Sequence, residues 1–320
     1  MKNRSKGEVN KGAELARLYG KHIHVLGAQL QATDAVIIAF VLFFDLLLVI
    51  FHGRVQDPWI LLGKNSFYLI LYIGAVYILP RISNRVLRFF IRTGSVQLIL
   101  GYLFLSVLPM QLIFVRTWQD PAVLRLEQSL FGAQPTIWLQ RFISPALTEW
   151  MMFSYVIYLV IYPVLCAVIC FKRGENAMED YLFTLVLANV LCCLGFLAFP
   201  VASPLYFMPE AYTVPLKGFF FTAWGEFIRK HLHQIGGSIP SPHTAIATVM
   251  WVMAHRHYRP AFYWLAPVIL SLYISTFYCR YHYVTDTFVG VLAAAVCILA
   301  APPFMRRWNT AVERRTTGAP

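Results

Sequence analysis

The sequence predicts an all-α fold, a polytopic membrane helix bundle with about eight transmembrane helices, and two observations support this. Of its 320 residues, 58% are hydrophobic and 13% are charged, with a mean hydropathy of +0.60. A soluble domain of this length is rarely so apolar. Several apolar runs also reach the roughly 17–25 residues that a helix needs to cross a bilayer, and no alternating strand pattern competes with them. A helical bundle is therefore expected.

Length, apolar runs and helix breakers divide the chain into candidate elements. Two stretches, 120–142 and 200–242, are too polar to span, and their amphipathic pieces "LEQSLFG" and "FFTAWGEFIRKHL" are expected along the membrane interface. Ser144 and Pro145 suit the cap and first turn of the fourth span. The expected spans are 34–52, 64–80, 95–115, 146–170, 179–199, 243–257, 261–279 and 283–304.

The basic residues predict the orientation of the bundle. Of the 27 Lys and Arg residues, 18 fall in the N-terminal segment, the alternate short loops on the same side and the C-terminal tail. Positively charged loops usually stay in the cytoplasm, so both termini are expected there. Arg81, Arg85, Arg88 and Arg92 share one helical face, which suits anionic lipid headgroups on the cytoplasmic side. The net charge of +12 is thus explained without nucleic acid as a partner.

The stretch "CRYHYVTD" carries a first pair of candidate functional residues. His282 and Asp286 are four residues apart and share a face where the last span begins. The carboxylate can fix the histidine tautomer and leave the other ring nitrogen free as a base or nucleophile. A simple interfacial ion pair, or a carboxylate placed by the helix dipole, remains the alternative.

The stretch "IPSPHTA" carries a third candidate, His243, at the start of the sixth span. Pro240 and Pro242 block helix before it, and Ser241 can cap the helix that follows. Free backbone N–H groups at such a start can cradle a phosphate, and a histidine there can donate a proton. The alternative is an ordinary helix start with a solvated histidine. Two spans separate His243 from His282, so both are expected on the non-cytoplasmic face.

Together these motifs resemble the phosphatidic acid phosphatase type 2 superfamily of membrane lipid phosphatases and phosphotransferases. "HYVTD", "LAFPVASPLY" and the stretch 120–150 are closest to its inositol phosphorylceramide synthase-like branch. The resemblance implies a six-helix phosphatase-type core in which His282 is the nucleophile, Asp286 orients it and His243 is the acid. Ser241 and Thr244 would hold phosphoryl oxygens. Neither a metal nor a cofactor is implied.

The chain departs from the family pattern in its cations. "FPVASPLY" has no basic residue, and Thr276 stands six residues before His282, where many members have arginine. Arg280 is the candidate phosphate clamp, because arginine offers a planar donor fork, although an interfacial arginine explains it equally. Further candidate substrate contacts are Lys217, Tyr283 and Glu149; Glu149 is alternatively a first-turn carboxylate.

The expected organisation has four parts: a basic cytoplasmic segment at 1–33, accessory spans at 34–115, a catalytic core at 116–304 and a basic cytoplasmic tail at 305–320. The expected protein lies in a bacterial-type cytoplasmic membrane and acts on a phosphorylated lipid at the non-cytoplasmic face. It passes the phosphoryl group to water, or a phospho-headgroup to a lipid hydroxyl. The alternatives are a zinc site built from the two histidines and the aspartate, and a non-catalytic transporter or scaffold.

Overall fold

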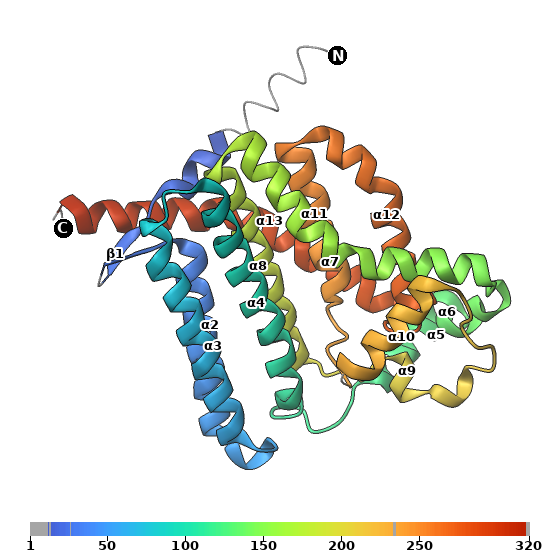
Figure 1. Ribbon diagram of the computed structural model, residues 1–320. Helices are drawn as coiled ribbons and strands as arrows, with labels where there is room; N and C mark the ends of the chain where they lie inside the picture. The colour runs from blue at the N-terminus through green and yellow to red at the C-terminus, as the bar shows by residue number, and fades with distance from the viewer. Residues whose placement is uncertain (1–11, 13, 26, 233–234, 318–320) are drawn as a thin grey trace.

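The computed structural model describes residues 12, 14–25, 27–232 and 235–317, and it is almost entirely helical (Figure 1). The described strands are β1 (Ile23–Val25) and β2 (Ala28–Leu30), which form one antiparallel hairpin. The all-α prediction is confirmed. The helices are α2 (Ala32–Ile50), α3 (Pro58–Ile78), α4 (Arg85–Val107), α5 (Asp120–Phe131), α6 (Pro135–Trp138), α7 (Pro145–Arg173), α8 (Glu175–Ala198), α9 (Pro204–Phe207), α10 (Phe220–Leu232), α11 (Pro242–His257), α12 (Arg259–Tyr278) and α13 (Val284–Thr317).

Seven of the described helices are long and apolar enough to cross a membrane, one fewer than the sequence predicts: α2, α3, α4, α7, α8, α12 and α13. The eighth expected span exists as α11, but it has only 16 residues. At a rise of about 1.5 Å per residue, α11 covers about 24 Å, less than the roughly 30 Å hydrocarbon core. It is shortened because proline sets its start and polar residues follow at its end.

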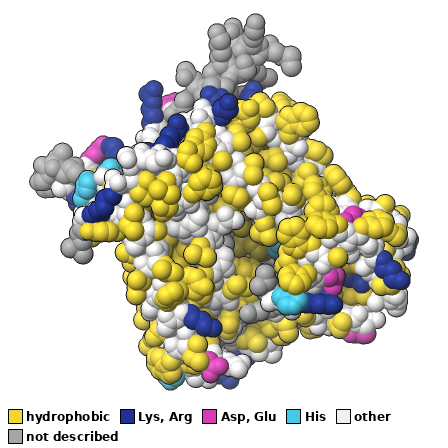
Figure 2. Space-filling model, in the orientation of Figure 1, with side chains coloured by type: hydrophobic (Ala, Val, Ile, Leu, Met, Phe, Trp, Pro, Cys, Tyr) yellow, Lys and Arg dark blue, Asp and Glu magenta, His cyan; other side chains and the backbone are white. Residues whose placement is uncertain are grey.

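The outer surface of the bundle is apolar, as the membrane prediction requires. Hydrophobic side chains cover much of the face drawn in Figure 2, with few charged groups among them. Large apolar side chains such as Ile70, Trp264 and Leu299 are more than 65% exposed. Exposed apolar area of this extent is typical of a surface that contacts lipid or another protein. Together with the seven apolar helices, it makes this chain an integral membrane protein.

Helix α8 lies at the centre of the bundle. It packs against α2, α4, α7, α11 and α13, and two thirds of its most apolar window is buried. Figure 1 shows α2 and α3 side by side at one edge, and the short helices α5, α6, α9 and α10 gathered at another. These short helices come from the two stretches predicted not to span. The last helix, α13, passes through Pro302 and Pro303 and continues beyond the expected end near residue 304.

The two helices expected to lie along the interface differ in their surroundings. Helix α10 is strongly amphipathic, and its exposed face carries Phe220, Trp224 and Phe227. Helix α5 is held more tightly, because Asp120 and Glu127 are completely buried. Buried carboxylates need partners, and those of α5 are the backbone just before α9 and the start of α13 with the residue before it.

Candidate functional site

The site is built where the first turns of α11 and α13 meet. The backbone N–H of Ser241 donates to the Asp286 carbonyl oxygen at 3.0 Å. The Thr244 hydroxyl donates to the carbonyl oxygens of Ser241 (3.1 Å) and Thr287 (3.3 Å). As predicted, Ser241 caps α11, with its Oγ 3.5 Å from the Thr244 backbone nitrogen. Two helix starts that lie 42 residues apart in sequence, Pro242 and Val284, are thus joined by buried hydrogen bonds.

Gly290 allows this close approach. A Cβ at position 290 would lie 2.1 Å from the Thr244 Oγ1 and 2.6 Å from the Ser241 carbonyl oxygen, both far inside van der Waals contact. Only a residue without a side chain fits between α13 and the first turn of α11. The fixed distance between the two helices therefore depends on this glycine.

We expect Gly290→Ala to lower the stability of the protein in detergent by about 1–3 kcal/mol, because overpacking a tight contact forces backbone shifts. Thermal unfolding should show a lower Tm. Gly74→Ala is the matched control, since nothing lies within 4 Å of its added Cβ. There the better helix propensity of alanine should leave stability equal or slightly higher. Equal Tm values for both variants would contradict the packing argument.

His282 is 3% exposed and its ring is held by one nitrogen. Nδ1 lies 3.1 Å from the Ser238 carbonyl oxygen, 3.3 Å from the Ser238 hydroxyl and 3.4 Å from the Asp286 carboxylate. A carbonyl oxygen can only accept, so Nδ1 carries the hydrogen in this contact. In the neutral imidazole this leaves the lone pair on Nε2, which is the tautomer that the spacing of His282 and Asp286 suggests.

The free nitrogen of His282 faces His243. Nε2 of His282 lies 3.3 Å from Nδ1 of His243, and the two rings are nearly perpendicular. The His243 ring stacks on Tyr155, with 4.4 Å between centroids, and meets the edge of Tyr158. The structure thus brings together the two histidines that the sequence predicts to be near each other.

Asp286 is completely buried and is shared between three groups. Its Oδ2 accepts from the Ser238 hydroxyl at 2.6 Å and from the Tyr283 backbone N–H at 3.0 Å, in addition to the His282 contact. Its Oδ1 has no partner among the described residues. Ser238 was missed from the sequence, because nothing in "GGSIPSPH" marks a serine five residues before His243 as a partner of a distant aspartate.

Two buried acids on α5 were also missed. Asp120 accepts from the backbone N–H groups of Ala202 and Ser203 and from the Tyr283 hydroxyl at 3.0 Å. Glu127 accepts from the backbone N–H and hydroxyl of Thr285. Burial raises the pKa of both carboxyls above their ordinary values. These acids hold the segments that flank the site and lie in the stretch that carries the family resemblance.

Arg280 occupies a left-handed conformation (φ 69°) in the turn between α12 and α13. Its guanidinium lies 4.4 Å from the Tyr212 ring and donates to the Val214 carbonyl oxygen, while its Nε is buried without a partner among the described residues. Burial lowers the pKa of this guanidinium from its ordinary value. The contacts that the structure gives Arg280 are thus with the segment before α10, and its role as a phosphate clamp stays a prediction.

The remaining predicted residues take different places. Tyr283 is fully buried, its hydroxyl bound to Asp120. Glu149 accepts from the backbone N–H groups of Phe219, Phe221 and Thr222, so its carboxylate caps the start of α10. Lys217 is exposed just before α10. Glu149 is therefore held as a cap on a neighbouring helix, and substrate contact by these residues remains a prediction.

An apolar cavity of about 340 Å³ adjoins His243. Its walls come from α4, α7, α8, α10 and α11, and His243 itself lines one side. Within the part of the chain that the structure describes, no group of three His, Cys, Asp or Glu side chains is placed to hold a metal ion.

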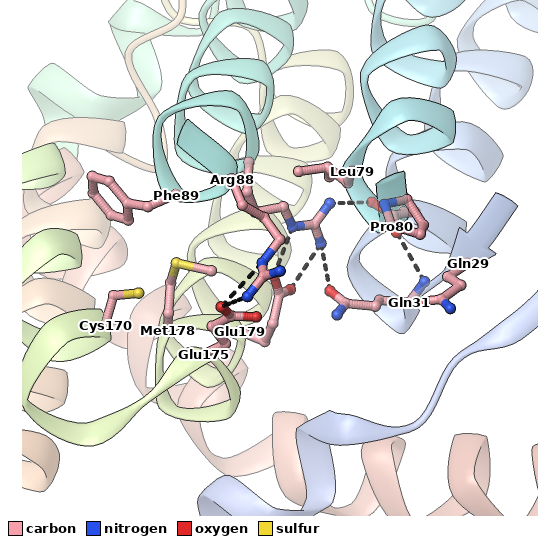
Figure 3. Close-up of a pocket in the computed structure, with 12 residues that line it drawn as sticks. Gln29, Gln31, Leu79, Pro80, Arg88, Phe89, Cys170, Glu175, Met178 and Glu179 are labelled. Atoms are coloured by element: carbon pink, nitrogen blue, oxygen red, sulfur yellow. Dashed lines mark hydrogen bonds and ion pairs between the residues drawn. The ribbon is translucent and has the colours of Figure 1, made fainter. Parts of the chain in front are cut away.

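A second, polar cavity of about 280 Å³ lies near the other end of α8 (Figure 3). Arg88 pairs with Glu175 there, and Arg92 pairs with Asp34 and Glu179. The Arg92 side chain is only 4% exposed. The row of arginines expected to meet anionic lipids therefore includes one that is buried inside the protein. Arg81, which is exposed, lies over the Tyr77 ring.

Comparison with known proteins gives one match. A family model described as the PAP2 superfamily matches residues 121–300, from α5 through most of α13. This segment holds all the residues of the two-histidine site. No curated protein and no solved structure matches the chain.

Proposed function

Since this chain belongs to the PAP2 superfamily, whose activity is that of phosphatases and phosphotransferases, we propose that it is a membrane lipid phosphatase or phosphotransferase that works through a phosphohistidine on His282. The observation that carries the proposal is the buried cluster in which Asp286 and Ser238 lie against Nδ1 of His282 and His243 lies against its Nε2. It gives a nucleophile with a fixed tautomer and, 3.3 Å from its free nitrogen, a second imidazole. A positioned acid next to an oriented nucleophile is the arrangement that phosphoryl transfer needs.

In the first half of the proposed reaction, Nε2 of His282 attacks phosphorus and an N–P bond forms. The bond between phosphorus and the lipid oxygen breaks, and His243 gives its proton to that oxygen. In the second half, His243 takes a proton from an incoming hydroxyl, which attacks phosphorus and releases His282. The Ser238 carbonyl oxygen holds the Nδ1 proton throughout, and the nearby Asp286 carboxylate stabilises the positive charge on the ring. We propose that Ser241 and Thr244 at the start of α11 bind phosphoryl oxygens, for which the Thr244 hydroxyl would exchange its hydrogen bonds to the carbonyl oxygens of Ser241 and Thr287.

The acceptor separates two forms of the activity. Water as acceptor makes the protein a phosphatase. A lipid hydroxyl as acceptor makes it a phospho-headgroup transferase like the inositol phosphorylceramide synthases, which "HYVTD" favours. Both use the same two histidines. We further propose that the site faces the non-cytoplasmic side, on the distribution of Lys and Arg.

The test uses purified protein in detergent with EDTA, given phosphatidic acid in one reaction and phosphatidylinositol with ceramide in another. Phosphate release from the first supports a phosphatase, and a phosphorylated ceramide product from the second supports a transferase. Vanadate, which mimics five-coordinate phosphorus, should inhibit either. Activity that EDTA abolishes and zinc restores would support the metal-dependent alternative instead.

Ser238→Ala tests the missed partner. It removes the hydroxyl that donates to Asp286 but keeps the backbone carbonyl that holds Nδ1 of His282. A hydrogen bond to a charged group contributes about 1.5–3 kcal/mol, so we expect turnover to fall about 10-fold or more while the protein stays folded. The control is Ser106→Ala, because Ser106 is equally buried but donates only to a carbonyl of its own helix. Unchanged kcat in Ser238→Ala would contradict a positioning role.

A further inference from the structure

The cavity beside His243 combines an apolar wall with isolated polar groups. Most of its surface comes from side chains such as Leu100, Phe104, Leu159, Leu185 and Ile246. A hydrocarbon chain would bind in such a space with a favourable free energy, because its apolar surface is removed from water. Besides His243, five polar side chains nevertheless line the same cavity: Gln97 on α4, Tyr155, Tyr158 and Tyr162 on α7, and Asn189 on α8.

These polar groups have few hydrogen-bond partners among the described residues. The hydroxyls of Tyr155 and Tyr162 are buried and make no hydrogen bond with any described residue. Among the same residues, no hydrogen bond reaches the Gln97 side chain, and Asn189 only accepts a long contact from the Cys193 thiol. Tyr155, Tyr162 and Asn189 are each less than 10% exposed.

Unpartnered polar groups in an apolar environment are costly. A buried donor or acceptor without a partner costs about 1–3 kcal/mol, and native proteins keep few of them. Two such hydroxyls, with the amides of Gln97 and Asn189 lining the same cavity next to a proposed catalytic histidine, indicate a ligand that supplies the missing hydrogen bonds. A pure hydrocarbon chain cannot do so.

Resting on the proposed function, we propose that this cavity binds the linkage region of the substrate lipid, where ester or amide groups join the acyl chains to the phosphorylated backbone. The amide N–H groups of Gln97 and Asn189 donate to the carbonyl oxygens of that region, and the tyrosine hydroxyls add donors beside them. The apolar walls hold the first carbons of the chains. The protein therefore selects acyl lipid phosphates over isoprenoid phosphates, which have no such polar groups.

The residues that α4 contributes to the cavity lie outside the segment that carries the proposed catalytic residues. Gln97, Leu100 and Phe104 precede the segment that the superfamily matches, residues 121–300, whereas His243 and His282 lie within it. The reactive groups thus belong to the shared core, and one wall of the lipid cavity comes from the additional N-terminal helices. The specificity of this chain depends on helices that the shared core does not include.

The experiment measures kcat/KM for phosphate release from three lipids in the same mixed micelles: phosphatidic acid, ceramide 1-phosphate and farnesyl phosphate. The unaltered protein should prefer the first two over farnesyl phosphate by about 10-fold or more, as one to two hydrogen bonds to the linkage would give. Gln97→Met combined with Asn189→Leu keeps the side-chain volumes and removes the amides. This variant should lose that preference, chiefly through slower turnover of the acyl lipids, and keep or improve turnover of farnesyl phosphate.

Leu98→Ala is the matched control, since Leu98 neighbours Gln97 on α4 but is 54% exposed and does not line the cavity. It should keep the preference of the unaltered protein. The inference is overturned if the unaltered protein shows no preference, or if the double variant slows all three substrates equally. The proposed function, and this inference with it, would instead be overturned if the unaltered protein released phosphate from none of the three lipids and also formed no phosphorylated ceramide from phosphatidylinositol and ceramide.

Discussion

Replacing His282 with alanine should lower phosphate release or transfer at least about 1,000-fold and abolish any covalent phosphoenzyme. The expected loss is large because Nε2 of the His282 imidazole is the proposed nucleophile that forms the new bond to phosphorus. Removing one member of a nucleophile–acid pair also makes the other member ineffective. The fold should persist, because Asp286 keeps its contacts with the Ser238 hydroxyl and the Tyr283 backbone N–H.

The first measurement is phosphate release from phosphatidic acid by the purified variant. The second is phosphate bound covalently to the protein, which is a phosphohistidine if acid removes it and base does not. His255→Ala is the control, because His255 lies exposed in the last turn of α11, at its other end from His243. It should leave turnover unchanged. Cellular lipids are also compared between a strain with the His282→Ala protein and a strain without the protein. The lipid that accumulates in both strains identifies the substrate. Full activity in His282→Ala would contradict the phosphohistidine mechanism, whereas cellular lipids unchanged by this substitution would favour the scaffold or transporter alternative.

Replacing Arg92 with leucine should destabilise the protein by about 3–5 kcal/mol, the cost typical of removing one partner from a buried ion pair. The guanidinium of Arg92 joins Asp34 on α2, Glu179 on α8 and Gln31 just before α2. The side chains of Arg92, Asp34 and Glu179 are each at most 4% exposed. Without the arginine, two carboxylates remain buried and uncompensated between three helices.

Arg88→Leu is the matched control one helical turn away. Arg88 pairs with Glu175 (Figure 3). Their side chains are 34% and 41% exposed. An exposed pair of this kind contributes about 0–1 kcal/mol. The Tm in detergent should therefore fall clearly in Arg92→Leu and little in Arg88→Leu. Similar Tm values would mean that the buried cluster contributes no more than a surface ion pair.

The sequence predicts the helices well but not their lengths. Apolar runs mark where a bilayer can be crossed, and all eight expected helices are present. Helix ends follow local hydrogen bonding instead. Helix α13 continues to Thr317 although Pro302 and Pro303 lie inside it, and α11 is too short for the usual span because Ser241 and Tyr258 bound it. The length of an apolar run in the sequence therefore does not give the length of the helix that contains it.

The candidate site shows a similar division. His282, Asp286 and His243 could be predicted from spacing, because four residues along a helix and two crossings both have defined geometry. Ser238, Asp120 and Glu127 could not be predicted in this way. Their partners lie 44 to 163 residues away, so their roles arise from packing that no local pattern encodes. Arg280 was identified by its charge, but the turn conformation decides where its guanidinium points.

Helix α11 is tied by buried polar groups at both of its ends. At its start, Ser241 and Thr244 bind the first turn of α13. At its finish, Arg256 and His257 bind Asp180 on α8, with the His257 contact at 2.8 Å. A piston-like slide of α11 by one turn, about 5.4 Å, would break both sets at once. The height of His243 in the bundle is thus set from two directions, and a lipid entering the site should displace side chains around α11 without moving the helix along its axis.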